Sequence, residues 1–369
     1  MSQVYKFGGS TIKSADALRS IANIVLKAKD LRVVVLSATY NSTNELEEIG
    51  RASKLSLIDS EELTQSFFDK HTVLCDDLEI GEEVNSFLID LKAETNSISD
   101  KIHLNGELSP LLMDTLYSIG ERLSSYILFS YLKKTSANDS IEFLDSRDHI
   151  VTNSEFSLAV PIFFELDKMK EVLSKDKVYI TQGFIGRDLK GNTTTLGREG
   201  SDYSASLFSW ALSTDKLVIW KDVKGIYQAD PKLLASARIL EKLSYEQAEL
   251  LTEKGAKVLF PRTMQPLRER KIDLVVKSTF YPNESGTTIS TSEHKGLIGI
   301  TTRDHDDKVV ISLLGENLFK VIDEENLLSH LSSKGISHSV YENFDHCFSI
   351  LIKKQDLKDV VGVFSKNFL

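Results

Sequence analysis

The first third of the chain alternates between short apolar runs and one helical stripe of apolar positions. The apolar segment 4–7 ends at a Gly-Gly pair, and Leu18, Ile21 and Val25 then recur at the spacing of one helix face. Residues 31–36 (LRVVVL) are apolar without alternation, which is typical of a parallel strand buried on both faces. This strand–helix–strand order predicts an α/β fold with helices on both faces of a sheet.

The middle of the chain changes character twice. Residues 44–135 are rich in Glu, Leu, Asp and Ser and have few β-branched runs, so we interpret them as a largely helical insertion. Beyond them the α/β alternation returns, with a helix over 201–213 and a second helix that begins at the capping box of Ser244 and Gln247. The strands expected in this region are 177–181, 216–220, 272–278 and, at an edge, 287–290.

A polar stretch at 292–296 predicts a linker between two domains. We expect a main domain over 1–292 and a smaller one over 296–369. In the smaller domain, short links join strands and helices in an order typical of a small α+β sandwich. Its strands are expected at 297–301, 309–314, 336–341 and 347–352, and its helices at 322–333 and 355–366.

Composition and charge narrow the classes of function. Hydrophobic residues make up 41% of the 369 residues and charged residues 27%, which is ordinary for a soluble protein with a sizeable core. The formal net charge of −10 argues against a dedicated nucleic-acid binder. Cys75 and Cys347 make neither a disulfide framework nor a metal-ligand spacing, and no apolar run approaches the roughly 18 residues of a membrane span. Since the start of the chain has no signal-peptide layout, we expect a cytoplasmic protein without a membrane or nucleic-acid partner.

The turn after the first strand, Lys6-Phe7-Gly8-Gly9-Ser10, could bind a phosphate. Two glycines let backbone N–H groups approach an anion, and Lys6 adds a positive charge beside it. Such a site suits a phosphoryl group in transfer, where negative charge develops on the non-bridging oxygens. The plainer alternative is a tight turn with a solvated lysine, because the pattern matches neither a P-loop nor a dinucleotide-binding fingerprint.

Residues 193–203 (TTTLGREGSDY) concentrate Gly, Arg, Ser and Asp at the start of the helix expected over 201–213. A helix N-terminus attracts anions, and Arg198 could form a bidentate pair with a carboxylate. Asp202 could cap the helix, hold Mg²⁺ through water or orient lysines. The alternative is ordinary helix capping with a surface arginine.

Further segments place polar residues where ligands bind in open α/β sheets. Lys221, Asp222 and Tyr227 follow the strand of 216–220 at its carboxyl end, where Tyr227 could stack on a base and Asp222 could accept a hydrogen bond from one. An ordinary turn would give the same residues. The other segments are 37–44 with Ser37 and Thr43, 120–122 with Glu121, and 255–259 with Lys257, and each alone also fits a cap or a solvated face.

Taken in order, these segments resemble the aspartate kinases of the amino-acid kinase family over nearly the whole chain. The matching motifs are KFGGS at 6–10, S-A…T-N at 37–44, GER at 120–122, TQGFIG at 181–186, TTTLGREGSDYSA at 193–205, DVKGIY-Q-ADPK at 222–232 and GAKVL at 255–259. The resemblance implies a carbamate-kinase-like αβα sandwich with a mostly parallel sheet, followed by a ferredoxin-like ACT module at 296–369. It also implies transfer of the γ-phosphoryl group of ATP, with Mg²⁺, to the β-carboxylate of L-aspartate, and a homodimer formed through the ACT-like module.

The resemblance further implies roles for single residues. Lys6 would stabilise the transferring phosphoryl group beside Gly8 and Gly9, and Asp202 would organise the catalytic site. Arg198 would bind a substrate carboxylate and Glu121 the substrate ammonium group. The other implied substrate-binding residues are Ser10, Ser37, Thr43 and Ser201, and the implied nucleotide-binding residues are Lys221, Asp222, Tyr227, Lys232 and Lys257.

The chain departs from typical aspartate kinases in its C-terminal part. These enzymes carry two ACT modules, one inserted into the other, whereas residues 296–369 suffice for one. The missing length lies between Thr302 and Lys308, which predicts weak or absent feedback inhibition by lysine or threonine. Lys221 and Lys232 also replace a common threonine and arginine, but both keep hydrogen-bond donors.

Two other functions stay open. The chain could be a related kinase acting on glutamate, N-acetylglutamate or UMP, although Glu121 and the ACT-like part favour a free amino acid. It could also be a non-catalytic amino-acid sensor, but such a protein would be expected to lose Lys6, Asp202 or Lys257. Our expectation is an enzyme of the aspartate pathway, which leads to lysine, threonine and methionine.

Overall fold

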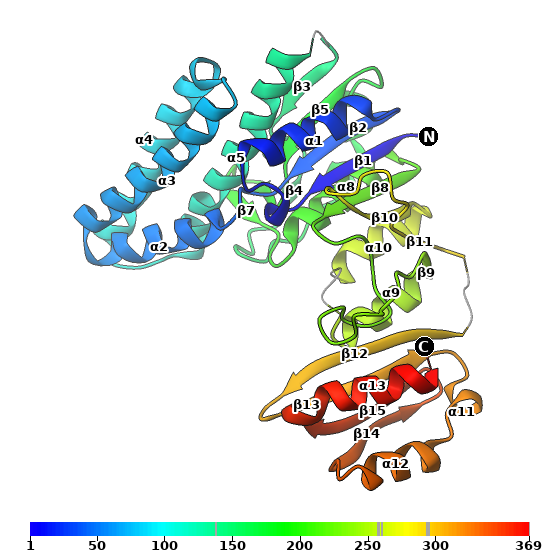
Figure 1. The fold of residues 1–369 in the computed structure, drawn as a ribbon. Helices are drawn as coiled ribbons and strands as arrows, with labels where there is room; N and C mark the ends of the chain where they lie inside the picture. The colour runs from blue at the N-terminus through cyan, green and yellow to red at the C-terminus, as the bar shows by residue number, and fades with distance from the viewer. Residues whose placement is uncertain (137–138, 257–258, 260, 293–295, 369) are drawn as a thin grey trace. The chain divides into compact units, whose positions relative to one another are not determined.

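The computed structural model describes residues 1–136, 139–256, 259, 261–292 and 296–368 of the chain (Figure 1). Contacts within the chain divide it into two compact units. Unit 1 consists of Met1–Asp222, Gln265–Leu274 and Ser278–Pro282, and unit 2 of Val223–Met264, Val275–Lys277 and Asn283–Leu369. Because these units follow contacts rather than the order of the chain, the domain boundary expected at 292–296 stays a prediction.

A parallel sheet forms the centre of unit 1. Its strands are β1 (Gln3–Phe7), β2 (Leu31–Leu36), β3 (Ile141–Leu144), β5 (Val178–Gln182) and β8 (Lys216–Lys221), in the order β3-β5-β2-β1-β8. Each neighbouring pair in this row is parallel. Lys6 of β1 pairs in register with Val35 on one side and Ile219 on the other. The continuous apolar sequences of β1 and β2 are buried, as expected for strands covered on both faces.

Helices cover this sheet and give the αβα arrangement that the sequence predicts. The helix α1 (Ala15–Lys27) begins where the Ser14 side chain accepts a hydrogen bond from the N–H of Ala17. The helix α8 (Gly200–Leu212) packs on β1, β2 and β8, and the short helices α6 (Phe163–Asp167) and α7 (Met169–Val172) contact α8 in turn.

The stretch expected to be helical forms α2 (Ser42–Leu55), α3 (Leu57–Asp77), α4 (Gly81–Asn105) and α5 (Pro110–Thr135). Figure 1 shows α3 and α4 side by side, extending away from the sheet. The helix α5 differs from them because it packs on β2, β3 and β5 and is buried over most of its circumference. It therefore brings Glu121 into the interior of unit 1.

A second, small sheet in unit 1 was not identified from the sequence. It consists of β4 (Val151–Thr152), β6 (Ile185–Asp188) and β7 (Thr193–Thr195), with β4 parallel and β7 antiparallel to β6. These strands are two to four residues long, which is too short for a readable alternation of apolar and polar positions. The last of them, β7, leads into the loop that precedes α8.

In unit 2, the helix α9 (Tyr245–Glu253) begins with the predicted capping box of Ser244 and Gln247. The strand β11 (Thr287–Ser290) pairs in parallel with β9 (Lys242–Ser244) and lies between β9 and β10 (Asp273–Ser278) in the strand order. The expectation that 287–290 is an edge strand is therefore wrong. The edge is β9, whose three residues begin with an exposed lysine and give no strand signal. The helix α10 (Pro261–Arg270) and β10 contain residues of both units.

The C-terminal part of unit 2 is an antiparallel sheet with helices, as expected for a ferredoxin-like module. Its strand order is β12-β13-β15-β14, with β12 (Leu297–His305), β13 (Lys308–Gly315), β14 (His338–Phe344) and β15 (Cys347–Lys353). Its helices are α11 (Leu318–Val321), α12 (Glu324–Ser333) and α13 (Leu357–Phe368). His305 pairs with Lys308, so only Asp306 and Asp307 join β12 to β13. A tight turn thus joins β12 and β13 at the place where the resemblance to aspartate kinases implies a second module.

The core of this sheet extends to the segment 228–237. Ala229 is buried in the same hydrophobic cluster as Ile311 and Phe348, and the N–H of Ile300 donates a hydrogen bond to the carbonyl oxygen of Gln228 at 2.7 Å. At the end of α9, the ammonium of Lys254 lies 2.9 Å from a carboxylate oxygen of Glu342 on β14. Within unit 2, apolar, hydrogen-bond and ionic contacts therefore connect the sheet to both preceding segments.

Candidate active site

Lys6 and Asp202 form a buried ion pair at the carboxyl end of β1. The Lys6 ammonium lies 2.6 Å from Oδ1 of Asp202, and the Lys221 ammonium lies 3.5 Å from Oδ2. Burial by itself would raise the pKa of Asp202, but the nearby charges of Lys6 and Lys221 outweigh it and hold the pKa below its ordinary value. The sequence suggested that Asp202 could cap the helix, hold Mg²⁺ through water or orient lysines. The contacts with Lys6 and Lys221 correspond to the third of these roles.

The Gly8-Gly9 turn brings the backbone close to this pair. A Cβ atom on residue 9 would lie 2.9 Å from the carbonyl oxygen of Ala38, so a side chain there would clash with the loop that follows β2. A Cβ on residue 8 would lie 3.4 Å from the Lys6 ammonium. The two glycines therefore leave backbone, rather than side chains, around the lysine.

Ser201 lies in the first turn of α8, next to Asp202. A Cβ on Gly183 would lie 2.5 Å from the Cβ of Ser201, so the turn after β5 packs directly against the start of α8. The N–H of Phe184 donates to the hydroxyl of Ser204 at 2.9 Å. The TQGFIG motif thus fixes the helix that carries Asp202.

Glu121 is almost completely buried, and it projects from α5 toward the loop after β2. Its Oε1 accepts a hydrogen bond from the N–H of Ala38 at 3.3 Å. Its Oε2 is buried and has no hydrogen-bond partner in the part of the chain that the structure describes. Burial raises the pKa of Glu121 to about 8, although the Ala38 N–H and the charge of Lys6 act in the opposite direction. In the free protein at neutral pH this group is therefore mostly protonated, and a cationic ligand group at Oε2 would favour its ionised form.

The structure places the remaining predicted substrate residues around this region with different exposure. Ser10 and Ser37 are half-buried, at the Gly-Gly turn and directly after β2. Thr43 is exposed in the first turn of α2, and Arg198 is exposed in the loop before α8. These two side chains are accessible to a ligand from solvent.

The predicted nucleotide-binding residues fall into three groups. Lys221 ends β8, and the exposed Asp222 follows it directly, still in unit 1. Tyr227, half-buried and paired with Ile239 by a β-bridge, and the exposed Lys232 belong to unit 2. Lys257 lies outside the described residues.

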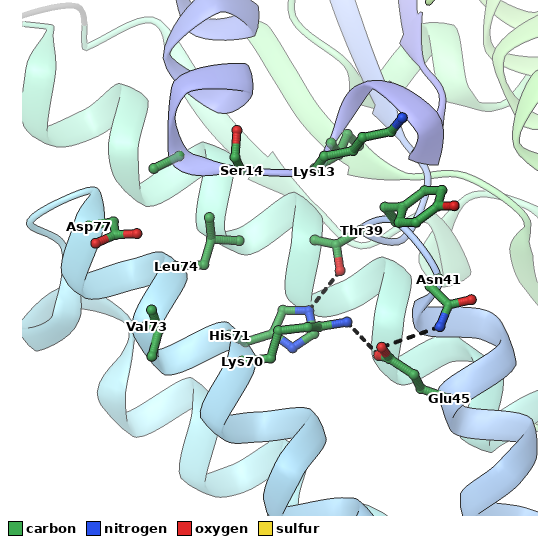
Figure 2. A pocket seen from close by; sticks show the side chains of 13 residues that line it. Lys13, Ser14, Thr39, Asn41, Glu45, Lys70, His71, Val73, Leu74 and Asp77 are labelled. Carbon is green, nitrogen blue, oxygen red and sulfur yellow. Dashed lines mark hydrogen bonds and ion pairs between the residues drawn. The ribbon is translucent and has the colours of Figure 1, made fainter.

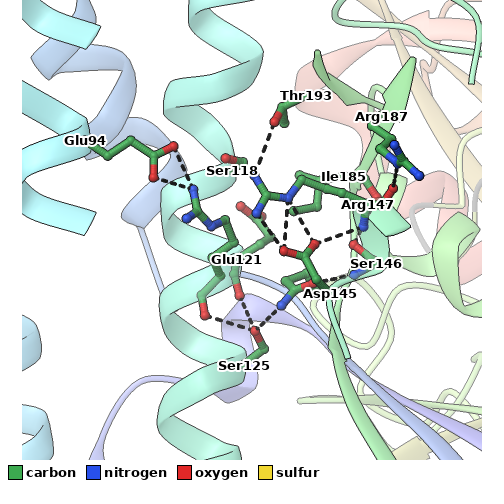
Figure 3. A network of polar contacts seen from close by, with 12 residues as sticks. Glu94, Ser118, Glu121, Ser125, Asp145, Ser146, Arg147, Ile185, Arg187 and Thr193 are labelled. Atoms are coloured by element: carbon green, nitrogen blue, oxygen red, sulfur yellow. Dashed lines mark hydrogen bonds and ion pairs between the residues drawn. The ribbon is translucent and has the colours of Figure 1, made fainter. Parts of the chain in front are cut away.

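Several polar contacts around the site were not predicted from the sequence. Arg122, next to Glu121, pairs with Glu94 at 2.8 Å, and Figure 3 shows Asp145 paired with Arg147 in the network near Glu121. Elsewhere on α5, the Asp114 carboxylate accepts hydrogen bonds from the backbone N–H and hydroxyl groups of both Ser157 and Thr195. The only available signal was an acidic residue inside an apolar helical run (LLMDTL), because its partners come from distant segments.

A pocket of about 660 Å³ opens between the start of α1, the loop 39–41 and α3 (Figure 2). His71 lies in its wall, with Nε2 2.9 Å from the Thr39 hydroxyl and Nδ1 2.7 Å from the carbonyl oxygen of Phe67. Burial lowers the pKa of His71 to about 3, so the ring is neutral at neutral pH. Lys70 pairs with Glu45 across the pocket. Because these polar groups satisfy one another, we place the candidate active site at Lys6 and Asp202 instead.

Two searches for other kinds of site gave negative findings. Among the residues that the structure describes, no group of three or more His, Cys, Asp or Glu side chains could hold a metal ion. In the same residues, every helix is too short or too polar to cross a membrane.

Comparison of the sequence with known proteins supports the resemblance. The chain is 33% identical over 298 residues to an aspartokinase of Chlamydia muridarum, covering 80% of this chain and 65% of the relative. It is 33% identical over 296 residues to the lysine-sensitive aspartokinase 3 of Escherichia coli, covering 78% and 63%. The chain thus spans slightly less than two thirds of the length of these relatives.

The fold is likewise similar to solved structures. Escherichia coli aspartokinase III in complex with aspartate and ADP matches with a TM-score of 0.86 at 23% identity, over 100% of this chain and 99% of that one. An aspartate kinase of Clostridium acetobutylicum matches with a TM-score of 0.78 at 18% identity, over 100% and 99%. The described architecture is therefore that of these kinases.

The model of the amino acid kinase family matches residues 1–278, which include Lys6, Glu121 and Asp202. This match covers well over half of the chain and contains the whole candidate site of unit 1. The chain belongs to the amino acid kinase family.

Proposed function

We propose that this protein is an aspartate kinase, which transfers the γ-phosphoryl group of ATP to the β-carboxylate of L-aspartate to give 4-phospho-L-aspartate and ADP. The observation that carries the proposal is the buried Lys6–Asp202 pair beside a Gly-Gly turn, with Lys221 on the other oxygen of Asp202. The 33% identity to proteins named aspartokinase supports the choice of substrate.

Phosphoryl transfer requires positive charge where the equatorial oxygens of the phosphoryl group become more negative. Asp202 orients the ammonium of Lys6, so the charge is in place before the substrates arrive. The backbone of Gly8 and Gly9 would contact the same oxygens. Lys6 itself transfers no proton in this scheme, because the acceptor carboxylate is already ionised at neutral pH.

The acceptor substrate is an amino acid with two carboxylates and an ammonium group. Glu121 would bind the ammonium through its unpartnered Oε2, and Arg198 would bind the carboxylate that does not react. The proposed hydroxyl contacts come from Ser10, Ser37, Thr43 and Ser201. A substrate without an ammonium, such as N-acetylglutamate, would leave Glu121 buried and unpaired.

The proposed nucleotide site consists of Lys221, Asp222, Tyr227, Lys232 and Lys257. Mg²⁺ would enter with the nucleotide and neutralise its phosphates. Mg²⁺ bound with a nucleotide commonly takes many of its ligands from phosphate oxygens and water.

The proposal also covers the location, the oligomeric state and the pathway of the protein. We propose a cytoplasmic homodimer formed through the ACT-like module, acting in the pathway to lysine, threonine and methionine. The edge strand β14 supports the dimer, because Val340, Tyr341 and Phe344 are exposed on it.

The deciding experiment traps the acyl phosphate as a hydroxamate and measures ADP release, with aspartate, glutamate, N-acetylglutamate and UMP as acceptors. We expect hydroxamate and ADP with aspartate. If product forms only with another acceptor, that acceptor replaces aspartate as the proposed substrate. If amino acids bind but no ADP is released, the result favours a non-catalytic amino-acid sensor. No product with aspartate contradicts the proposal.

A further inference from the structure

Both polar atoms of the Ser37–Ala38 peptide group are hydrogen-bonded to side chains of α5. The Ala38 N–H donates to Oε1 of Glu121 at 3.3 Å, and the hydroxyl of Ser124 donates to the Ser37 carbonyl oxygen at 2.7 Å. Glu121 and Ser124 are three residues apart, on the same side of the helix. One helix turn therefore fixes the orientation of one peptide group.

The single proton of the Ser124 hydroxyl has two acceptors in reach. The Glu121 carbonyl oxygen lies 3.1 Å away, but it already accepts from the Ser125 hydroxyl at 2.8 Å. The Ser37 carbonyl oxygen is closer. We therefore assign the proton to the bond with Ser37.

Close packing fixes the distance between α5 and this loop. A Cβ on Gly120 would lie 3.0 Å from the Cβ of Ala38 and 3.2 Å from a methyl group of Leu46. The helix backbone thus contacts the loop directly, and the approach needs a glycine. The loop cannot move closer to compensate for a lost hydrogen bond.

The same turn of α5 is also bonded to the sheet. Figure 3 shows Ser125 beside Glu121, and its hydroxyl accepts from Nε2 of Gln182 at 3.2 Å. Oε1 of Gln182 accepts from the N–H of Ser146 at 2.8 Å. The backbone of Glu121 is therefore fixed independently of Ser124, so losing the Ser124 hydroxyl would release the loop rather than the helix.

We propose that Ser124 is a positioning residue for the acceptor substrate. It orients the 37–41 loop and the first turn of α2 that follows it, and thereby sets the distance between the substrate-facing groups of this segment and the unpartnered oxygen of Glu121. The inference rests on the proposed function, because it assumes that loop and Glu121 bind one substrate. Without the Ser124 hydroxyl, the Ser37 carbonyl loses its partner, and the loop must turn toward water to recover one.

The kinetic test compares Ser124→Ala with Ser118→Ala. Ser118 is a matched control, since it is buried on the same helix but, among the described residues, its hydroxyl donates only to the carbonyl oxygen of Thr115 in that helix, at 2.7 Å. We expect Ser124→Ala to raise the KM for aspartate about tenfold, with kcat changed less than about threefold, as loss of one positioning hydrogen bond predicts. Ser118→Ala should change both values less than about twofold. Equal effects in the two variants, or an unchanged KM in Ser124→Ala, would overturn the inference.

Amide hydrogen exchange without substrate separates this inference from the proposed function. Residues 38–44 should exchange faster in Ser124→Ala than in wild type, and Ser118→Ala should match wild type. This readout holds even if aspartate proves to be the wrong acceptor, which the hydroxamate assay on wild type shows separately. If Ser124→Ala fails to fold, amide hydrogen exchange of the wild-type protein is the test. The Ala38 amide should then be as protected from exchange as the amides in the interior of α5. Rapid exchange at Ala38 would refute the proposal.

Discussion

At the residue scale, Glu121 combines a stability cost with a proposed binding role. Its carboxyl group is buried, and burial raises its pKa to about 8. Between pH 4.5 and 8 the unfolded chain releases this proton while the folded chain keeps it. The folded state then binds more protons than the unfolded state, so this group makes the protein less stable as pH rises through that range.

Glu121→Gln should remove this pH dependence. Because Gln keeps an acceptor for the Ala38 N–H but does not ionise, we expect its melting temperature to exceed that of wild type by a few °C at pH 8 and to approach it at pH 5. The same variant should raise the KM for aspartate. Calorimetry at the two pH values tests the first effect, and an equal difference at both pH values would contradict it.

Lys6 and Asp202 give a second prediction at this scale. Lys6→Ala should lower kcat by about 100-fold or more, because it removes a charge at the reacting phosphoryl group. It also leaves the buried Asp202 without its close partner, which we expect to cost about 3 kcal/mol of unfolding free energy.

The double variant Lys6→Ala/Asp202→Asn separates these effects. It should regain most of the lost unfolding free energy, measured by urea titration, while remaining inactive. If the double variant is no more stable than Lys6→Ala, the ion pair does not account for the loss.

Sequence reasoning nominated Lys6, Asp202 and Glu121 because their residue types stand beside glycines and helix starts. It did not give the contacts among them. Ser124 and Gln182 look like ordinary helix and strand residues, and only packing of α5 against β2 and β5 shows their bonds. Buried polar partners of this kind depend on tertiary contacts that local sequence does not encode.

At the scale of elements, long apolar runs and caps predicted the framework well. The strands β1, β2 and β8 and the capping box of α9 lie where the sequence placed them. The short strands β3, β4, β6, β7 and β9 were missed, because two to four residues form a strand only when neighbours pair with them.

Asp114 connects such a short strand to α5. Its carboxylate accepts from both Thr195 of β7 and Ser157, so Asp114→Asn would turn an amide donor toward existing donors. We expect a loss of about 2 kcal/mol or more in unfolding free energy. Asp90→Asn, at an exposed position of α4, should change it by less than about 0.5 kcal/mol. Similar values for the two variants in urea unfolding would remove Asp114 as the anchor of β7.

At the scale of the whole molecule, the tight turn between β12 and β13 bears on regulation. The resemblance to aspartate kinases implies a second ACT module there, whereas in this chain Asp306 and Asp307 alone join the two strands. We expect lysine and threonine, titrated into the kinase assay at millimolar concentrations, to leave the rate nearly unchanged. Strong inhibition by either amino acid would show that a single module suffices for an inhibitor site.

The joined core of unit 2 has a consequence for engineering. Ala229, Leu233 and Leu234 contribute to the hydrophobic cluster of the C-terminal sheet, and Gln228 is bonded to Ile300. A gene shortened to end before β12 would expose these leucines to solvent and leave an apolar patch on the remaining protein. We therefore expect the smallest soluble version of this protein to retain the C-terminal sheet.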